Sequence, residues 1–382
     1  MTGGRRKKVL LDFQGGWGLG DLLCADPLPA GLVEQEGLPL EIRTRGKAGN
    51  LLHNPLVAGE APPGWRPDRV VEIKLFNRMP LEEYARLEAL PSLVDHLCAY
   101  GGVVPRERRP RLHLTGAERE IVSRFPLERV PGRPLAAVCT DFFDPYRHWP
   151  RERWIPVLEH LWKRGARIVE VGLQPALGAG MDLCGGRLPI RVAAAVLERC
   201  DLFLGHNTGT FHYAQAAGIP CVTLFSLALP QRFVHDGALV VPVQADLPCR
   251  NCMTRDMAAR VREGCPLDPP GACMRAIPPG AVLQALDRIW EEFLLRRDRE
   301  GRESGRARAF RWENLLLHAR ELERWGAPGR AAHFRDQAGR LAGKAPERAD
   351  PPPRLLPSLA PGSPPSARAE GRSSWAPASQ PL

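Results

Sequence analysis

No apolar run in this chain of 382 residues approaches the roughly 18 residues that a helix needs to cross a bilayer. The start, MTGGRRKKVLLDFQ, has a basic cluster before an apolar run, but that run is only about four residues long before Asp12. It therefore predicts a first β-strand rather than a signal peptide, and a cytoplasmic protein. Hydrophobic residues make up 44% and charged residues 25%, as is ordinary for a soluble globular protein.

Acidic residues are too few to balance the charge, and the formal net charge is +10. Most of the surplus lies between Arg296 and Lys344, where basic residues outnumber acidic ones by about six. This extension is a candidate contact for anionic lipid head groups at the inner face of the cell membrane. A solvated, arginine-rich helix face is the alternative interpretation. We expect no nucleic-acid partner, because the rest of the chain is nearly balanced.

Strands and helices alternate in both halves of the chain. Strands are predicted at KVLLDF, LPLEIRTR and RVVEIK in the first half, and at LAAVCT, ARIVEVG, DLFLGH and PCVTLF in the second. The helices between them include LLCADPLPAGLVEQEG, PRERWIPVLEHLWKRG, IRVAAAVLERC and FHYAQAAG. This alternation predicts an α/β fold of two Rossmann-like domains that face each other across a cleft.

We place the domain boundaries where the pattern changes. The first Rossmann-like domain covers residues 1–115, and the second covers 116–298, with its closing helix from about Pro279 to Arg297. A basic helical extension follows at 299–344, with two amphipathic helices around the turn Gly326–Gly329. Residues 345–382 are rich in Pro, Ser, Ala and Arg, which predicts a disordered tail.

The first Gly-rich turn is GGWGLGD, over Gly15–Asp21. Its glycine spacing resembles a dinucleotide fingerprint, but that motif expects an acidic residue after the second strand, where Arg43 and Arg45 stand instead. Asp21 at the start of a helix would repel a pyrophosphate, whereas it is well suited to act as a general base toward a neutral hydroxyl. Simple capping of the helix is the alternative role.

The second Gly-rich turn, GHNTGTFH, carries Thr208, Gly209 and Thr210 at a helix N-terminus and His212 about one turn later. Backbone N–H groups, hydroxyls and an imidazole in that arrangement can hold a diphosphate without a metal. Ordinary capping, with His212 half-buried, is again the alternative. In the loop TDFFDPYRHWPRERW, Arg147 offers a fixed positive charge, and Trp149 is expected to pack the next helix down, with Pro150 at its first position.

Four motifs together resemble glycosyltransferase family 9, which includes the ADP-heptose:lipopolysaccharide heptosyltransferases. They are GLGDLL, RHWPRERW, DLFLGHNTGTFHYAQAAGIPCVTLF and the trailing CRNC, spread over residues 8–295. The resemblance implies a GT-B fold, with the acceptor held mainly by the first domain and the nucleotide-sugar by the second. It implies that Asp21 is the general base of an inverting, metal-independent transfer. It also implies a donor-binding set of Thr140, Arg147, Asn207, Thr208, Gly209, Thr210 and His212.

Two departures from the family bear on the sugar. The family commonly has Asp where this chain has Asn207, and that Asp is thought to contact hydroxyls of the donor sugar. Asn can still donate and accept hydrogen bonds, so transfer itself is compatible with the change. The acidic residue usual in the loop after the second domain's second strand is also missing from GLQPALGAGMD. Heptose and ADP therefore follow from the family rather than from these residues.

Ten cysteines fall into two groups. Six are scattered in apolar contexts and are expected to be small buried hydrophobes: Cys24, Cys98, Cys139, Cys184, Cys200 and Cys221. Four gather in one loop-rich stretch and are better suited to tetrahedral Zn or Fe than to disulfides: Cys249, Cys252, Cys265 and Cys273. The autotransporter heptosyltransferases, a related branch, carry a structural metal on such a cluster. No cofactor is expected for catalysis.

The sequence therefore predicts a glycosyltransferase that moves a sugar from a nucleotide-diphosphate donor to a saccharide or lipid-linked acceptor, in lipopolysaccharide or cell-surface glycan synthesis. One alternative is an oxidoreductase that binds NADP at GGWGLGD with help from Arg43 or Arg45. A second is a non-catalytic protein that keeps the fold as a scaffold, with the hairpin and the Pro-rich tail as interaction elements.

Overall fold

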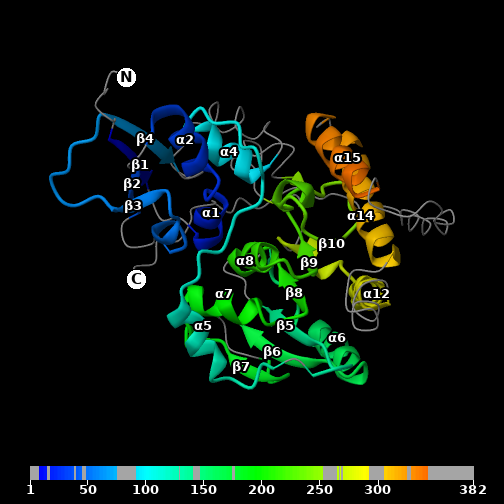
Figure 1. The fold of residues 1–382 in the computed structure, drawn as a ribbon. Coiled ribbons are helices and arrows are strands. Elements are labelled where there is room, and N and C mark those ends of the chain that lie inside the picture. The colour runs from blue at the N-terminus through cyan, green and yellow to red at the C-terminus, as the bar shows by residue number, and fades with distance from the viewer. Residues whose placement is uncertain are drawn as a thin grey trace.

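The structure is a computed structural model of the chain, and Figure 1 shows its fold. It describes residues 8–14, 18–37, 40–44, 49–74, 92–128, 130–140, 147–173, 177–252, 265, 267, 270–291, 305–324 and 328–342. The predicted Pro-rich tail at 345–382 and Arg45 lie outside the described residues.

A four-stranded parallel sheet forms the first half of the fold, in the spatial order β3-β2-β1-β4 (Figure 1). Its strands are β1 (Val9–Gln14), β2 (Leu40–Arg43), β3 (Val57–Glu60) and β4 (Arg69–Lys74). Strand β1 buries five residues in a row, as is typical of a parallel strand covered on both faces. The sequence predicts three of these strands and misses β3, which is short and lies at the edge of the sheet.

The helices of this half are α1 (Leu19–Cys24), α2 (Leu28–Glu36), η1 (Leu51–His53) and α4 (Leu93–Ala99). The prediction of one continuous helix over 22–37 was wrong. The chain turns at 25–27 between α1 and α2, because Pro27 has no N–H with which to continue the hydrogen bonds of α1. Helix α1 is therefore short, and it begins within the Gly-rich segment Gly15–Asp21.

A six-stranded parallel sheet forms the second half, in the order β10-β9-β8-β5-β6-β7. Its strands are β5 (Leu135–Cys139), β6 (Arg167–Val171), β7 (Met181–Leu183), β8 (Leu202–His206), β9 (Cys221–Phe225) and β10 (Val240–Gln244). The three central strands β5, β8 and β9 are buried along their whole length. Because the strands are parallel, their carboxyl ends meet along one edge of the sheet.

Helices cover both faces of the second sheet. Helices α5 (Gly116–Ser123), α7 (Ile190–Leu197) and α8 (Gly209–Ala217) pack on one face, and α6 (Arg151–Lys163) and α12 (Pro279–Ile289) on the other. Two short helices, η4 (Pro230–Phe233) and α11 (Ala272–Arg275), lie in the connections. One detail of the sequence prediction was wrong: Pro150 caps α6 from outside rather than opening it. The predicted closing helix is present as α12, and residues 292–297 at its predicted end lie outside the described part of the chain.

The segment between α4 and α5 joins the two halves and is bonded to both. The Arg108 guanidinium lies 2.8 Å from Asp95 of α4 and forms an ion pair with it, while its backbone N–H donates to Asp236 of the second half at 2.9 Å. The backbone N–H of Arg111 donates to Asp26, just after α1, also at 2.9 Å. This segment is the cyan chain that crosses between the two sheets in Figure 1.

Two long helices, α14 (Gly305–Arg324) and α15 (Pro328–Ala342), form the helical hairpin that the sequence predicts. Their apolar sides join the core on the face of the second sheet that α7 and α8 cover, through Leu315, Ala319, Leu322, Ala331, Phe334 and Ala338. The basic extension is therefore packed into the second half of the fold rather than appended to it. None of the described helices is both long and apolar enough to span a membrane.

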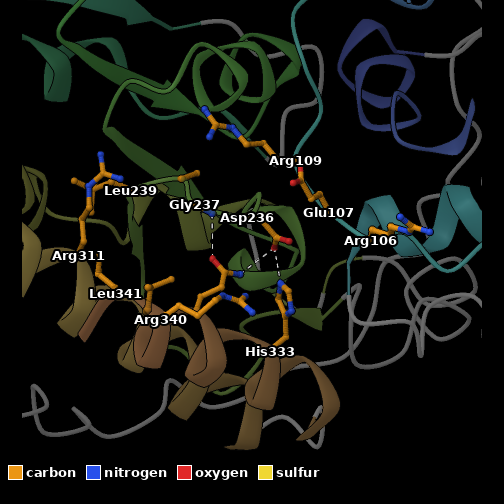
Figure 2. A pocket seen from close by; sticks show the side chains of 13 residues that line it. Arg106, Glu107, Arg109, Asp236, Gly237, Leu239, Arg311, His333, Arg340 and Leu341 are labelled. Atoms are coloured by element: carbon orange, nitrogen blue, oxygen red, sulfur yellow. Dashed lines mark hydrogen bonds and ion pairs between the residues drawn. The ribbon is translucent and has the colours of Figure 1, made fainter. Parts of the chain in front are cut away.

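A buried ion pair fastens the hairpin. The Arg330 side chain is fully buried, lies over the Phe334 ring at 4.4 Å and pairs with Asp236 at 3.1 Å. Asp236 also accepts from His333 at 2.7 Å and Gln337 at 3.0 Å (Figure 2). Burial alone would raise the pKa of Asp236, but the His333 hydrogen bond and the Arg330 charge outweigh it and hold that pKa well below its usual value.

We expect Arg330→Met to lower the free energy of unfolding by about 3–5 kcal/mol, because it leaves the Asp236 carboxylate buried without its cation. Arg335→Met is the matched control on the same helix, since Arg335 and its partner Glu323 are both exposed. Arg335→Met should lower the free energy of unfolding by less than about 1 kcal/mol. Urea unfolding of both variants measures the difference, and equal losses would contradict this account of the hairpin.

Candidate active site

The turn after β8 lies at the carboxyl edge of the second sheet and opens helix α8. Thr208 is the N-cap residue of α8 with extended backbone, and its N–H donates to the carbonyl of His206 at 2.9 Å. Its side chain makes no capping hydrogen bond, so capping is not the role of this hydroxyl. Asn207, Thr208 and Gly209 are partly exposed, whereas Thr210 is buried. The outer part of the turn is thus accessible to a ligand.

Arg147 is held against this turn. Its Nη1 donates to the backbone carbonyl of Asn207 at 2.9 Å. Behind it, Trp149 is buried and donates from its indole nitrogen to the carbonyl of Ile277 at 3.0 Å, which ties the loop to the body of the domain. Its ring also meets that of Trp154 in α6 edge-on, at a centroid distance of 4.9 Å, so the expected packing of Trp149 against the next helix is confirmed.

Thr140 belongs to the same edge of the sheet. It follows directly on β5, and β5 is paired with β8 in a register that sets Cys139 opposite Gly205. Thr140 is partly exposed there. Residues 141–146 of the loop lie outside the described part of the chain.

Two glycines bring α1 of the first half against the start of α8. A Cβ atom added to Gly20 would lie 2.7 Å from the Cα of Gly209 and 3.0 Å from Cδ2 of His212. A Cβ on Gly209 would lie 3.2 Å from the backbone nitrogen of Gly20. The neighbouring atoms are largely backbone and cannot move aside, so this contact requires glycine at position 20. It brings the residue after Gly20 to the Thr208 turn.

That residue is Asp21, which is partly buried at the interface. Burial raises the pKa of its carboxyl group to about 6, against the opposing effects of the Arg147 charge and a hydrogen bond to the Gly18 backbone. The interaction with Arg147 joins a residue of the first half to one of the second. Asp21, Arg147 and the Thr208 turn therefore form one site, and the Asp21 carboxyl group titrates close to neutral pH.

His212 differs from the other predicted donor-binding residues, because its ring points inward. It is 4% exposed, and its Nδ1 lies 3.3 Å from Sγ of Cys24 and 3.1 Å from Nε2 of His235. Its Cδ2 edge faces Gly20. Burial, together with the Arg147 charge, lowers the pKa of His212 to about 3, so its imidazole is neutral at physiological pH.

The four clustered cysteines lie beyond β10. Cys273 is buried, while Cys249, Cys252 and Cys265 are partly exposed. Burial raises the pKa of Cys273 to about 11, and the charges of Cys265, Cys249 and Cys252 add to that rise. The four cysteines therefore lie in one region of the fold, although they span 25 positions in the sequence.

Sequence reasoning missed two residues beside this site. Cys24 is a buried cysteine, as expected, but the sequence does not reveal that it touches two histidines. His235 lies between η4 and β10, and was not considered. No spacing signal was available, because the two contacts of Cys24 are with residues 188 and 211 positions away in the chain.

A cavity of about 560 Å³ opens elsewhere, between the α4–α5 segment and the hairpin. Figure 2 shows Arg106, Arg109, Asp236 and Arg340 around it. None of the residues predicted for the active site lines this cavity. It is therefore separate from the Asp21 site.

Comparison with known families finds that residues 122–261 match the model of glycosyltransferase family 9 (heptosyltransferase). The matched range contains the Arg147 loop, the Thr208 turn, and the cysteines at 249 and 252. No curated protein matches the sequence significantly.

Solved structures with the same fold include the iron-containing dodecameric glycosyltransferase TibC of enterotoxigenic E. coli, at 19% identity and a TM-score of 0.59, covering 75% of this chain and 77% of TibC. TibC in complex with ADP-D-β-D-heptose matches at 18% identity and a TM-score of 0.58, covering 75% and 78%. A family 9 glycosyltransferase of Veillonella parvula has 14% identity and a TM-score of 0.58, covering 75% and 98%. At these identities the likeness concerns the fold, which is α/β of the GT-B type.

The Gly20 contact leads to a stability prediction. We expect Gly20→Ala to lower the free energy of unfolding by about 1–3 kcal/mol, because the added methyl group overlaps backbone of α8. Gly280→Ala in α12 is the control, since a Cβ there meets nothing within 4 Å. Alanine favours helix over glycine by up to about 1 kcal/mol, so the control should be neutral or stabilising. Thermal unfolding of both variants measures the difference. A Gly20→Ala protein as stable as the wild type would contradict the close approach of α1 and α8.

Proposed function

We propose that this chain is a glycosyltransferase of family 9 that transfers a heptose from ADP-heptose to a saccharide acceptor of lipopolysaccharide or another cell-surface glycan. One observation carries the proposal: a carboxylate of the first half meets an arginine and a helix-opening turn of the second half across the Gly20–Gly209 contact. A base and a diphosphate site on opposite sides of a substrate are what glycosyl transfer requires.

The donor diphosphate would lie at the start of α8. The α8 dipole and the first N–H groups of the helix favour an anion there, and the hydroxyl of Thr208 is not used for capping. The Arg147 guanidinium, fixed on the Asn207 carbonyl, adds a full positive charge. These groups can stabilise the departing ADP without a metal ion at the phosphates. Thr140 and Thr210 complete the proposed donor-binding set, with Asn207 facing the sugar hydroxyls. His212, which the sequence also predicts for this set, contributes only through its place in the first turns of α8, because its ring points inward.

Asp21 would be the general base. It takes the proton of the acceptor hydroxyl while that oxygen attacks the anomeric carbon from the face opposite the diphosphate. The bond from the anomeric carbon to the diphosphate oxygen breaks in the same step, so the configuration inverts. A pKa of about 6 leaves Asp21 ionised at pH 7.5 yet more basic than an ordinary aspartate, as an efficient base requires.

The four clustered cysteines are proposed to hold a structural Zn or Fe ion. Four thiolates are the donor set that tetrahedral zinc and iron sites use. The similarity in fold to the iron-containing TibC supports this proposal. The ion would stabilise the segment after β10 and would take no part in transfer.

Contact of the hairpin with a membrane stays a prediction. Three of its exposed arginines pair with acidic residues of the same hairpin: Arg324 with Glu321, Arg335 with Glu323, and Arg340 with Asp336. This pairing reduces the positive charge that the hairpin can present to anionic lipid. The cytoplasmic location belongs to the proposal as well, because the nucleotide-sugar donor is a cytoplasmic metabolite class.

The NADP alternative receives less support. Arg43, which would have to bind the 2′-phosphate, pairs with Asp12 across β1 and β2 at 3.4 Å. The family match covers the second half, to which the NADP interpretation assigns no role.

The base role is tested with Asp21→Asn. We expect transfer from ADP-heptose to fall by about 10²–10⁴-fold, while the Kd for ADP changes little, because the amide cannot accept the proton. The free energy of unfolding of Asp21→Asn should equal or exceed that of the wild type, because burial makes the ionised form of the Asp21 carboxyl group unfavourable in the folded protein. In the wild type, transfer should decline as the pH falls through about 6. Full transfer activity of the variant would contradict the base role. A wild-type protein without transfer activity, in which Asp21→Ala leaves every cellular phenotype intact, would support the scaffold alternative.

The donor site is tested by calorimetry with ADP. Arg147→Met should weaken ADP binding by about tenfold to a hundredfold, the usual worth of a hydrogen bond from a charged donor. Arg151→Met is the matched control, because Arg151 is exposed at the start of α6 only four residues away. Equal affinity of both variants for ADP would place the diphosphate elsewhere. A parallel thermal-shift series with ADP-, GDP- and UDP-sugars identifies the nucleotide, since only a bound donor raises Tm.

A further inference from the structure

Three potential metal ligands meet behind the candidate active site. Cys24 ends α1, His212 lies in the first turns of α8, and His235 stands in the connection between η4 and β10. All three are at least 96% buried. Their donor atoms, Sγ, Nδ1 and Nε2, all lie within 4.8 Å of one another.

The triangle of donor atoms has the size of a tetrahedral metal site. The sulfur of Cys24 lies 3.3 Å from Nδ1 of His212 and 3.5 Å from Nε2 of His235, and the two nitrogens are 3.1 Å apart. A tetrahedral zinc ion with ordinary bond lengths sets sulfur and nitrogen about 3.6 Å apart and two nitrogens about 3.3 Å apart. Each edge of the triangle is within about 0.3 Å of these values.

Hydrogen bonds alone do not account for this cluster. A neutral imidazole nitrogen carries either one hydrogen or one lone pair, so each of the two nitrogens can take part in one regular hydrogen bond. At most two of the three short contacts can then be regular hydrogen bonds, and the third is left without one. A metal ion satisfies all three donor atoms at once, because each offers it a lone pair.

The surroundings hold the ligands in place. Gln215 of α8 donates to the carbonyl of Phe233 at 2.8 Å and accepts from the backbone N–H of His235, also at 2.8 Å. The next residue, Asp236, is tied to Arg330 and Arg108. The connection that carries His235 is thus fixed from both sides, and its ring stacks on His212 at a centroid distance of 5.2 Å.

We propose that Cys24, His212 and His235 bind one divalent ion of the zinc class, with a water molecule or a bound anion as the fourth ligand. Binding releases the thiol proton of Cys24, since the thiolate is the ligand. The ion links α1 of the first half to α8 and the His235 connection of the second. Coordination through Nδ1 leaves the hydrogen of His212 on Nε2, which is bonded to the Cδ2 that faces Gly20. The site is distinct from the four-cysteine cluster beyond β10, and it stands whether or not the proposed transfer reaction is correct.

The test uses the full chain with Cys249→Ser and Cys252→Ser, which disable the four-cysteine cluster as a second metal site. We expect this protein to keep one zinc ion per chain by elemental analysis after dialysis. After exchange, Co²⁺ should give a thiolate-to-cobalt charge-transfer band. Adding Cys24→Ser should abolish the band and the bound metal. Cys98→Ser, which changes another fully buried cysteine of the first half, should keep both.

His235→Gln is a second variant that removes a different ligand, in case Cys24→Ser does not fold. Circular dichroism and the elution volume in size-exclusion chromatography verify the fold of each variant. Loss of metal in both the folded Cys24→Ser protein and the folded His235→Gln protein supports the site. Metal retained by either folded variant would overturn it, as would a folded parent protein that neither contains metal nor takes up Zn²⁺ or Co²⁺ in calorimetry. These readouts do not involve transfer, so they are independent of the Asp21 experiments.

Discussion

The backbone contact between Gly20 and Gly209 is the constraint on which the candidate site depends. Each half of the chain supplies only part of the chemistry: the first has a carboxylate on a short helix, and the second has an arginine and an accessible helix start. At a Cβ-to-Cα distance of 2.7 Å, any side chain at position 20 would keep the two parts separate. Glycine here serves the approach of two helices rather than the turn of a dinucleotide motif.

The surroundings of this contact explain the unusual titration of Asp21. Burial between two packed helices raises the pKa of its carboxyl group to about 6, and the Arg147 charge limits the rise. The same burial keeps His212 neutral on the other side of Gly20. The interface therefore carries a carboxyl group with a raised pKa and a neutral imidazole next to a helix start that favours anions. Asp236, through its bonds to Arg108 and to Arg330 of the hairpin, holds the connecting segment in place.

Much of the fold could be predicted from the sequence, and the missed strands share one property. The strands β1, β5, β6, β8 and β9 are recognisable because long buried runs mark strands covered on both faces. The missed strands β3, β7 and β10 all lie at sheet edges, where strands are short or tolerate Pro242. The motifs likewise indicated Asp21, Arg147 and the Thr208 turn. The cluster of Cys24, His212 and His235 could not be predicted, because only the fold brings these residues together.

The most direct test of the central claim is a crystal structure of the protein with ADP-heptose. The account predicts a diphosphate at hydrogen-bond distance, about 3 Å, from the Thr208 turn and from Arg147, with the anomeric carbon facing the Asp21 carboxylate. A diphosphate bound elsewhere, such as in the cavity beside Asp236, or a sugar with Asp21 turned away from it, would contradict the claim that the two halves build one transfer site.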